Sequence, residues 1–414
     1  MLHRRAFLTD TSLVALAVSI PSSLITLFLR PFYFAMKESE RKGEIESKWL
    51  TLFLCGDVMT GRGIDQVLPH PSVPRIHEPY AIDARDYVAL AERVNGPISK
   101  PVDFAYIWGD ALGEFGRRRP DVRIVNLETS VTDSQEWMPK GINYRMHPRN
   151  ILCLTAANID CCVLANNHVL DWGYSGLLQT LETLADADIV FAGAGRDRQQ
   201  ASTPAVLDVA ERGRVLVFAF GLATSGIPAS WAASQNEPGV NFLQDLSPQT
   251  ADRVALQIQS VKRPRDVVVV SVHWGGNWGY EISLEQRRFA HRLIDQGGVD
   301  IIHGHSSHHV KGIEVYRGRL ILYGCGDFLN DYEGIAGYEA FRSDLALMYF
   351  ATLAPGRGEL QRLEMVCLQS RRFRLHSAAG EDVEWLRRTL NREGATFGTQ
   401  VAKRQDDTLL LNWV

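Results

Sequence analysis

The sequence has little of several features that mark particular protein classes. Its 414 residues include six cysteines and no Cys-x-x-Cys pair, so we expect neither a disulfide framework nor a zinc-ribbon or thioredoxin-like site. Glycine and proline number 34 and 17, which excludes collagen-like and low-complexity chains. The formal net charge is −4, so no strong basic field attracts nucleic acid. With 45% hydrophobic residues, the chain is expected to fold as one large or two ordinary domains.

The N-terminus contains an apolar run without charged residues at 11–29, preceded by His3, Arg4 and Arg5. Its length is close to the roughly 20 residues that span a bilayer. A basic start followed by an apolar run is typical of a signal peptide or signal anchor. Because no Ala-x-Ala cleavage site follows, we expect an uncleaved anchor that leaves the body membrane-anchored and extracytoplasmic. The alternative is a start codon assigned too far upstream, with a cytoplasmic protein.

Seven short apolar, β-branched runs in the rest of the chain predict buried strands. Leu177, Leu181 and Leu184 lie between two of these runs and have the spacing of a buried helix face. Alternating strands and helices predict an α/β layered fold in which both sheet faces are covered. The predicted strands are 50–57, 122–128, 159–168, 214–221, 266–274, 299–305 and 319–327.

Polar side chains stand at the points where five of these strands end. In α/β folds, ligands collect beyond the carboxyl ends of the strands. Carboxylate, amide and imidazole groups are the ligands of hard to borderline divalent ions. Each residue also has a simpler interpretation as a turn, a cap or a packed imidazole, but their repetition at strand ends predicts a metal site. These residues are Asp57, Glu128, Asn167 with His168, His273 and His305.

Six blocks in order along the chain resemble the capsule-synthesis protein CapA family, also called poly-γ-glutamate capsule biosynthesis proteins. They are GDVMTGRG (56–63), NLETSVT (126–132), LANNHVLDWG (164–173), VHWGGNWGYE (272–281), GHSSHHVKGIEVYRG (304–318) and LILYGCGDF (320–328). This family is related to the calcineurin-like metallophosphoesterases, so the resemblance implies a four-layer α-β-β-α sandwich. We expect three parts: a signal or anchor segment with a charged spacer at 1–48, a CapA-like domain at 49–355, and a C-terminal extension packed on the body at 356–414.

The resemblance also implies a site for divalent metal ions, with Mn, Fe or Zn as candidates and either one or two ions bound. The implied ligands are Asp57 on the first ion, Glu128 between the two ions, Asn167 and His273 on the second ion, and His305 and His308 from the closing block.

Three further residues are candidates for the chemistry. By the resemblance, His168 would face the substrate as a proton donor or phosphate-orienting group, and Asp171 would orient His168 or another ligand. Arg62 stands in a glycine-flanked loop and is expected either to pair with a phosphate or to be a solvated loop arginine.

The sequence departs from the superfamily pattern at two places. Met59 stands where the first block normally has a histidine ligand, and a thioether is a poor ligand for a hard ion. The closing block has one extra residue between its histidines, and Ser306 stands where a histidine is common. Which of His305, His308 and His309 binds metal therefore stays open.

The resemblance implies a role in capsule or poly-γ-glutamate biosynthesis and a metal-dependent phosphoesterase-type hydrolase site. One alternative is a non-catalytic polymer-binding or assembly and export factor. Another is a metal-dependent hydrolase that acts on γ-glutamyl amide bonds. The expected partners are an anionic polymer or phosphoester substrate, other capsule-synthesis membrane proteins, and the membrane through the N-terminal segment, with no role for nucleic acid.

Overall fold

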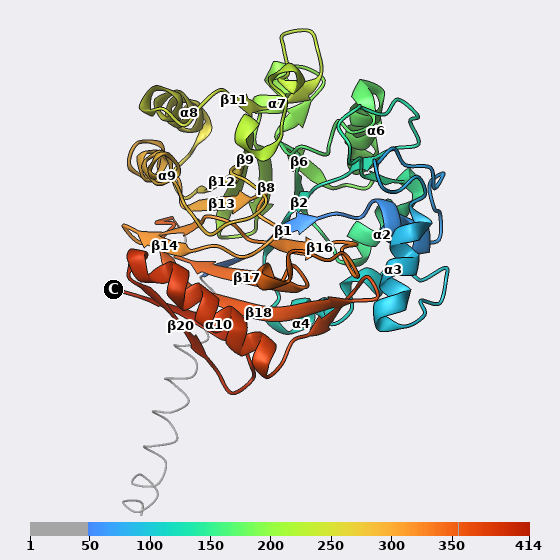
Figure 1. Cartoon of the computed structure of the whole chain (residues 1–414). Helices are drawn as coiled ribbons and strands as arrows, with labels where there is room; N and C mark the ends of the chain where they lie inside the picture. Colours follow the sequence, from blue (N-terminus) through green and yellow to red (C-terminus); the bar gives the residue numbers. More distant parts are fainter. Residues whose placement is uncertain (1–48, 355) are drawn as a thin grey trace, which may run out of the picture. The chain divides into compact units, whose positions relative to one another are not determined.

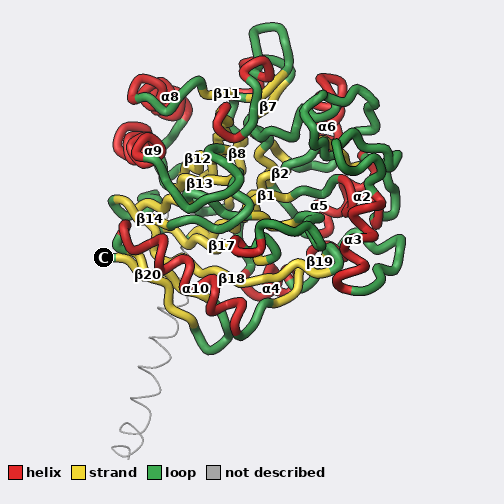
Figure 2. Tube along the Cα trace, viewed as in Figure 1, coloured by secondary structure: helices red, strands yellow, loops and turns green. Residues whose placement is uncertain are grey.

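The computed structural model describes residues 49–354 and 356–414. The predicted anchor at 11–29 and the charged spacer after it lie outside the described residues. Among the helices of the described part, none combines the length and the apolar composition needed to cross a lipid bilayer. The described residues form a mixed arrangement of sheets and helices (Figure 1 and Figure 2), which confirms the predicted α/β class.

The larger sheet is built around β1. This strand pairs in parallel with β2 and antiparallel with β17, while the short β16 pairs in parallel with its carboxyl end. The short β19 pairs with β18. In spatial order the strands are β20 (Thr399–Lys403), β21 (Leu409–Trp413), β18 (Leu360–Arg371), β17 (Leu345–Leu353), β1 (Leu50–Val58), β2 (Val122–Leu127), β5 (Cys161–Val163) and β6 (Val190–Ala192), with β16 (Asp327–Leu329) and β19 (Arg374–Ser377) off this path.

The second sheet has the parallel strands β9, β12, β13 and β15 at its centre. β12 contains four consecutive valines and is buried along its whole length, as expected for a central parallel strand covered on both faces. In spatial order the strands are β11 (Phe242–Leu243), β9 (Gly213–Leu222), β12 (Val267–His273), β13 (Ile301–His305), β15 (Arg319–Leu322) and β14 (Ile313–Tyr316), and β8 (Ala205–Val209) pairs with β9. Two further ladders join β3 (Ser130–Val131) to β4 (Arg145–Met146) and β7 (Ala194–Gly195) to β10 (Gly239–Val240).

Local sequence signals explain where several helices begin. The Ser247 hydroxyl accepts a hydrogen bond from the Thr250 N–H ahead of α8, and Ser283 and Gln286 form a capping box at α9. The helices are α2 (Arg62–Val67), α3 (Arg85–Asn95), α4 (Ala111–Arg118), α5 (Leu152–Ala156), α6 (Gly173–Asp186), α7 (Arg198–Ser202), α8 (Pro248–Val261), α9 (Leu284–Gly297) and α10 (Glu381–Gly394). Single 3-10 turns occupy Tyr106–Trp108, Pro148–Ile151, Ala223–Ser225, Ala229–Trp231, Glu339–Phe341 and Ala395–Phe397.

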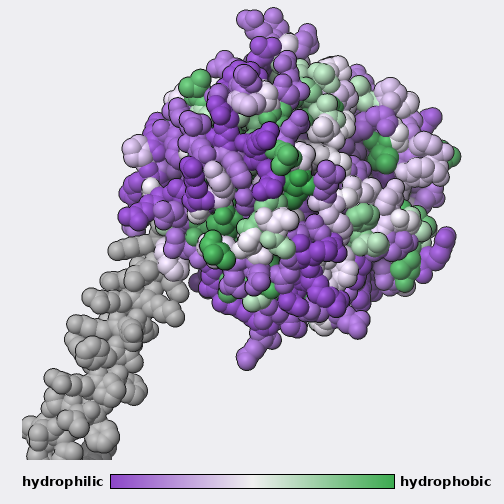
Figure 3. Space-filling model, turned by 60° about the vertical axis from the view of Figure 1, so that its left-hand side comes forward, coloured by the Kyte–Doolittle hydropathy of each residue, from purple (hydrophilic) through white to green (hydrophobic). Residues whose placement is uncertain are grey.

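Three buried clusters show how these elements pack. One combines side chains from both sheets, such as Leu54 of β1 and Val269 of β12, so these faces of the sheets contact each other. A second cluster joins the larger sheet to helices that include α6, and a third joins the second sheet to α8 and α9. Figure 1 shows α8 and α9 beside the second sheet, away from α2, α3 and α6. On the face seen in Figure 3, apolar residues form small separate groups among hydrophilic ones.

The chain after residue 355 continues the larger sheet. β18 pairs antiparallel with β17 along nearly its whole length, and β21 and β20 extend the sheet beyond β18. Val383 and Leu386 of α10 belong to the buried cluster between the two sheets. The segments EDVEWLRRTLNRE and TLLLNWV, for which the sequence indicated a helix and a strand, form α10 and β21.

Two predicted strands are shorter than expected. The run 159–168 forms strand only at Cys161–Val163, because the following residues leave the sheet as the loop that carries Asn167 and His168. The run 319–327 divides into β15 and the first residue of β16, so it contributes to both sheets. Asn167 and His168 therefore lie beyond β5, whereas Asp327 begins β16.

Candidate metal centre

The ends of parallel strands from both sheets meet at the candidate site. Asp57 of β1 is the register partner of Asn126 on β2 and of Asp327 on β16. In the second sheet, His273 ends β12 and is the register partner of His305, which ends β13. Because the carboxyl ends of parallel strands in one sheet lie at the same edge, each sheet presents a pair of neighbouring polar side chains there.

Two groups of buried side chains have the spacing of metal ligands, and Asp57 belongs to both. One group is Asp57, His273 and His305, and the other is Asp57, His308 and Asp327. Within each group, one potential ligand atom per residue lies within 4.8 Å of the others. The Oδ2 atom of Asp57 is buried and has no hydrogen-bond partner. An orphaned buried carboxylate oxygen among nitrogen and oxygen donors fits a bound cation, because an uncompensated buried charge is costly.

A hydrogen-bonded chain behind His305 determines which of its ring nitrogens is free. Nε2 of His303 lies 2.7 Å from the carbonyl oxygen of Cys55, and a carbonyl only accepts, so this nitrogen carries the proton. Burial lowers the pKa of His303 to about 4, so its Nδ1, 3.1 Å from the Ser271 hydroxyl, accepts from that hydroxyl. Ser271 in turn accepts from Nε2 of His305 at 2.7 Å. Nδ1 of His305 therefore carries no proton, and its lone pair is free to bind a cation.

That lone pair faces a second imidazole. Nδ1 of His305 lies 2.6 Å from Nδ1 of His273. The other nitrogen of His273, Nε2, lies 3.0 Å from Oδ1 of Asn167 and 3.7 Å from Oε1 of Glu128. The predicted ligands Asn167, Glu128 and His273 are thus brought together, and Asn126 links Glu128 to Asp57 through hydrogen bonds of 2.9 and 2.8 Å.

The buried acids and neutral imidazoles of the candidate centre favour the binding of a cation. Burial, and next to it the charge of Asp327, raise the pKa of Asp57 to about 7. Burial and the charge of Asp57 also raise the pKa of Glu128 well above its usual range. Burial lowers the pKa values of His273 and His305 well below the usual range, so these imidazoles are neutral at pH 7. A metal ion requires neutral imidazoles and deprotonated carboxylates, so the imidazoles are already in the binding form and the acids lose their protons when an ion binds.

His168 is held by a carboxylate and faces the metal ligands with its other nitrogen. Nδ1 of His168 lies 2.6 Å from Oδ2 of Asp171, and Oδ1 of Asp171 pairs with Nζ of Lys140 at 2.7 Å. Nε2 of His168 lies 3.9 Å from Oε1 of Glu128. Burial lowers the pKa of His168 to about 4, although the charge of Asp171 acts in the opposite direction. The predicted contact between Asp171 and His168 is therefore present.

Arg62 is occupied by carboxylates of the protein itself. Its Nε and Nη2 atoms donate to Asp331 at 3.1 and 2.5 Å, and Nη1 donates to Glu78 at 2.9 Å. The guanidinium is buried and stacks over the ring of Tyr87, 3.9 Å from its centroid. The alternative of a solvated loop arginine is wrong, because Arg62 begins α2 and is buried where that helix packs against α3. Binding of a phosphate by Arg62 stays a prediction.

Sequence reasoning missed Asp327 and Asn126. The sequence did contain a signal for Asp327. The tripeptide Cys-Gly-Asp that ends in Asp57 occurs a second time and there ends in Asp327. Met59 is buried, and its sulfur accepts a hydrogen bond from the Tyr332 hydroxyl at 3.6 Å. Asp327 places a carboxylate oxygen beside Asp57 where an ion could be held, whereas position 59 offers no oxygen or nitrogen. Nothing local to Asn126 distinguishes it from an ordinary strand residue.

Of the clustered histidines, two point toward the acids. His308 reaches Asp327 with Nδ1 at 2.8 Å. Burial lowers the pKa of His308, but the charge and hydrogen bond of Asp327 together with the charge of Asp57 outweigh burial, so the pKa is raised. His305 belongs to the other ligand group. His309 instead packs against the rings of Tyr280 and Phe341, with centroid distances of 4.6 and 4.7 Å. The geometry thus favours His305 and His308 as the metal ligands of the closing block.

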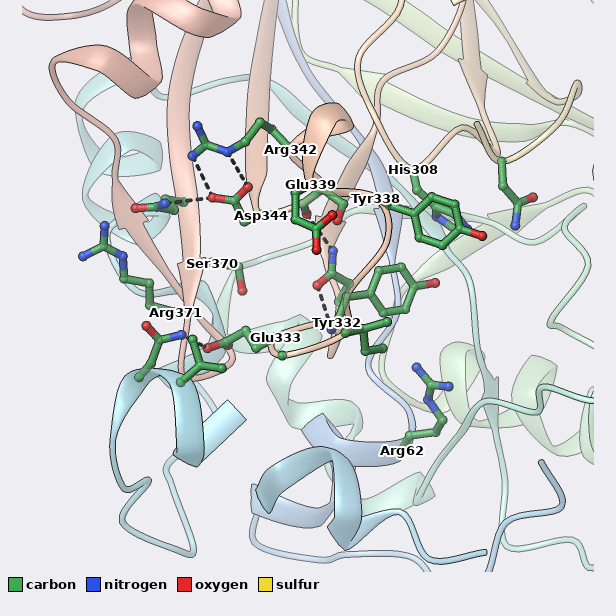
Figure 4. A pocket seen from close by; sticks show the side chains of 18 of the residues that line it. Arg62, His308, Tyr332, Glu333, Tyr338, Glu339, Arg342, Asp344, Ser370 and Arg371 are labelled. Carbon is green, nitrogen blue, oxygen red and sulfur yellow. Dashed lines mark hydrogen bonds and ion pairs between the residues drawn. The ribbon is translucent and has the colours of Figure 1, made fainter. Parts of the chain in front are cut away.

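A cavity of about 650 Å³ opens beside the centre. Figure 4 shows His308, Tyr332 and Tyr338 on one side of it and Arg342, Asp344 and Ser370 on the other. A ligand in this cavity would have direct access to the His308 side of the metal ligands.

Comparison with known proteins identifies relatives that share most of the chain. The family model described as "Bacterial capsule synthesis protein PGA_cap" matches residues 51–332. A protein of Mycobacterium tuberculosis named "Probable polyglutamine synthesis accessory protein" is 48% identical over 362 residues, which cover 87% of this chain and 95% of that protein. The PGA biosynthesis protein CapA of Bacillus subtilis is 26% identical over 347 residues, covering 83% and 78% of the two chains.

A solved structure, that of GAP50, the anchor in the inner membrane complex of Plasmodium, aligns with a TM-score of 0.31 and 9% identity. The alignment covers 81% of this chain and 90% of that one. A similarity at this level does not establish a shared fold.

Proposed function

Because this chain belongs to the PGA_cap family of bacterial capsule synthesis proteins, we propose that it acts in capsule or poly-γ-glutamate biosynthesis as a metal-dependent hydrolase of phosphoesters. The proposed hydrolytic activity rests on two buried groups of potential metal ligands that share Asp57. The Oδ2 atom of Asp57 has no hydrogen-bond partner among the described residues. The proposed layered sandwich of metallophosphoesterase type agrees with the buried cluster between the two sheets. The proposed division at 49–355 contains the whole segment that matches the family model.

The proposed ligands are Asp57, Glu128, Asn167, His273, His305 and His308, to which we add Asp327. When bound there, a divalent ion such as Mn²⁺, Fe²⁺ or Zn²⁺ would act as a Lewis acid toward a phosphoryl oxygen. Asn126 holds Asp57 and Glu128 in place through its amide. Ser271 and His303 fix the tautomer of His305.

His168 is the proposed proton donor. Hydrolysis of a phosphoester forms a bond from a water oxygen to phosphorus and breaks the bond from phosphorus to the leaving oxygen, which must gain a proton. Asp171 accepts from Nδ1 of His168, which leaves Nε2 directed toward the space beside Glu128. An anionic phosphate would raise the low pKa of His168 and so favour the protonated form that donates to the leaving oxygen.

The experiment is a metal and activity measurement on the full-length protein in detergent. We expect bound Mn²⁺, Fe or Zn²⁺ and hydrolysis of bis(4-nitrophenyl) phosphate or 4-nitrophenyl phosphate. His168→Ala should retain the metal and lose activity by roughly 10²-fold or more. His291→Ala is the control, because His291 on α9 contacts Glu314 and Tyr316 outside the site. Metal content that survives Asp57→Ala and His273→Ala unchanged would contradict the site.

A specific observation favours an assembly role as the second candidate. Met59 replaces the expected histidine ligand and is held by Tyr332, and the Mycobacterium tuberculosis relative is named an accessory protein. Under this hypothesis the metal is retained but neither phosphate ester is hydrolysed. Hydrolysis of γ-glutamyl amide bonds is tested on the same protein with a γ-glutamyl anilide. We also propose that the protein is attached to the membrane with an extracytoplasmic body. Its proposed partners are other capsule-synthesis membrane proteins and an anionic polymer.

A further inference from the structure

The cavity beside the metal ligands has an apolar and aromatic rim. Tyr80, Val94, Ile335 and Tyr338 all line it and are 69%, 60%, 43% and 46% exposed. Tyr338 stacks on Trp278 with ring centroids 4.1 Å apart and planes within 6° of parallel. The pairing fixes the orientation of the Tyr338 ring while leaving much of its surface exposed. Exposed aromatic and aliphatic side chains gathered at one cavity are typical of a binding site.

The charged side chains of the cavity are largely neutralised by the protein. Arg342 pairs with both Asp344 and Asp382, at 2.7 and 2.6 Å. The Glu333 carboxylate accepts the backbone N–H groups of Arg372 and Phe373 at 2.7 and 2.6 Å. Arg62, at the opposite end, is held by two carboxylates as described above. Arg371 is the one arginine of the lining without an ion-pair partner among the described residues, and Figure 4 shows it on the side away from His308, so a polyanion meets a single uncompensated cation in this cavity.

The same cavity offers several groups that form hydrogen bonds. Ser370 lines it, and its buried hydroxyl has no partner among the described residues. The side chains of Asn95, Asn277 and Gln369 line the cavity as well, and Glu339 stands beside Tyr338. Figure 4 shows Glu339 between Tyr338 and Asp344. A ligand that fits this cavity has a flat apolar face that stacks on the Tyr338 ring. Around its edge it has groups that donate and accept hydrogen bonds.

We propose that this cavity binds a sugar ring, and that the substrate of the metal centre is a sugar phosphoester. A pyranose has apolar C–H faces that stack on an aromatic ring, and its hydroxyl groups satisfy neutral and paired polar side chains around the edge. Its phosphate would extend past His308 toward Asp57, where the ligand groups lie. This inference rests on the proposed hydrolytic function for the phosphate part, while the sugar part rests on the cavity alone.

The test measures binding by quenching of tryptophan fluorescence and by calorimetry, on the full-length protein in detergent with Mn²⁺. The probes are N-acetylglucosamine 1-phosphate, glucose 1-phosphate, glycerol phosphate, AMP and the corresponding neutral methyl glycosides. We expect at least one sugar phosphate to bind about 10-fold more tightly than glycerol phosphate. Tyr338→Ala should bring its affinity down to that of glycerol phosphate, and Ser370→Ala should weaken it about 3- to 10-fold.

Tyr174→Ala is the matched control, because Tyr174 is 42% exposed on α6 and does not line the cavity. It should leave every affinity unchanged. Equal affinities for sugar phosphates and glycerol phosphate, or tighter binding of AMP than of any sugar phosphate, would overturn the proposal. If a neutral methyl glycoside binds in a Tyr338-dependent manner but no phosphoester is hydrolysed, the sugar site stands and the proposed hydrolase fails. If phosphoesters are hydrolysed without preference for a sugar, the hydrolase stands and the sugar site fails.

Discussion

Asp57 and Asp327 are register partners on the neighbouring parallel strands β1 and β16, and both carboxylates are buried. Each follows a Cys-Gly dipeptide, and the Gly326 carbonyl accepts the Asp57 N–H at 3.0 Å. A Cβ on Gly56 would lie 1.6 Å from the Gly326 oxygen, so the approach of the two segments requires a residue without a side chain. Burial, and after it the repulsion between the two acids, raises the pKa of Asp57 to about 7.

The first prediction concerns Asp327. Asp327→Asn removes one carboxylate from a ligand group and should weaken Mn²⁺ binding by at least roughly 10-fold. The number of ions per chain should also fall if that group holds its own ion. Calorimetric titration and elemental analysis measure both quantities. Asp186→Asn on the exposed end of α6 is the control. Unchanged affinity and stoichiometry would remove Asp327 from the ligand set.

A second prediction follows from the hydrogen-bonded chain behind His305. Ser271→Ala removes the acceptor of the His305 Nε2 proton, so the ring is free to adopt the other tautomer and its Nδ1 lone pair is no longer fixed. We expect metal affinity to fall by roughly 10- to 100-fold although no ligand has been removed. Ser260→Ala, at an exposed position of α8, serves for comparison. A Ser271→Ala protein with normal affinity would show that the chain does not orient His305.

The pH dependence of metal binding provides a third test. With a pKa of about 7 in the metal-free protein, Asp57 becomes increasingly protonated as the pH falls below 7, and a protonated carboxyl is lost as a ligand. The apparent affinity for Mn²⁺ should therefore fall with decreasing pH, by up to about 10-fold per pH unit for each proton released. Titrations between pH 5.5 and 8.5 check this. Asp57→Asn should give a weaker and flatter profile, and an equally steep profile would assign the proton to another group.

A fourth prediction concerns Asp171, which we regard as a positioning residue for His168. Asp171→Asn exchanges the acceptor of the Nδ1 proton for an amide and removes a charge that raises the pKa of His168. We expect kcat to fall by roughly 10²-fold with little change in KM, and the alkaline limb of the kcat profile, where the proton donor is lost, to move to lower pH. A loss of stability alone would change neither the shape of the profile nor the ratio of kcat to KM per folded molecule.

The fifth prediction concerns stability. Arg62→Ala leaves Asp331 and Glu78 as buried carboxylates without their cation, which should lower the free energy of unfolding by about 3–5 kcal/mol. Arg62→Lys should not restore it, because an ammonium group lacks the fork that holds both acids. Thermal and urea unfolding measure the effect. Arg85→Ala breaks an exposed pair with Asp83 and should change stability little. A small effect at Arg62 would mean that water replaces the guanidinium.

The positions of the strands and most of the polar residues at their ends could be predicted from the sequence. β12 begins with four consecutive valines and ends in His273, and β13 begins with two isoleucines and ends in His305, so local pattern suffices. The helical spacing of Leu177 and Leu181 in the sequence likewise predicted the helix that contains them. These features are local because burial of a strand or of one helix face imposes a period on neighbouring residues.

The tertiary structure decided which residues act together. Arg62 pairs with Asp331, which lies 269 residues away, and no local pattern indicates that contact. The separation of His305 and His308 from His309 depends on how β13 and the loop after it pack against Asp327 and the aromatic residues around Trp278. Asp327 and Asp57 meet because the parallel strands β1 and β16 are in register, although the two residues are far apart in the chain. The sequence by itself determined the kinds of ligand at the strand ends, whereas register and the packing of two sheets determined their partners, because distances between residues remote in the chain are set only when the sheets assemble.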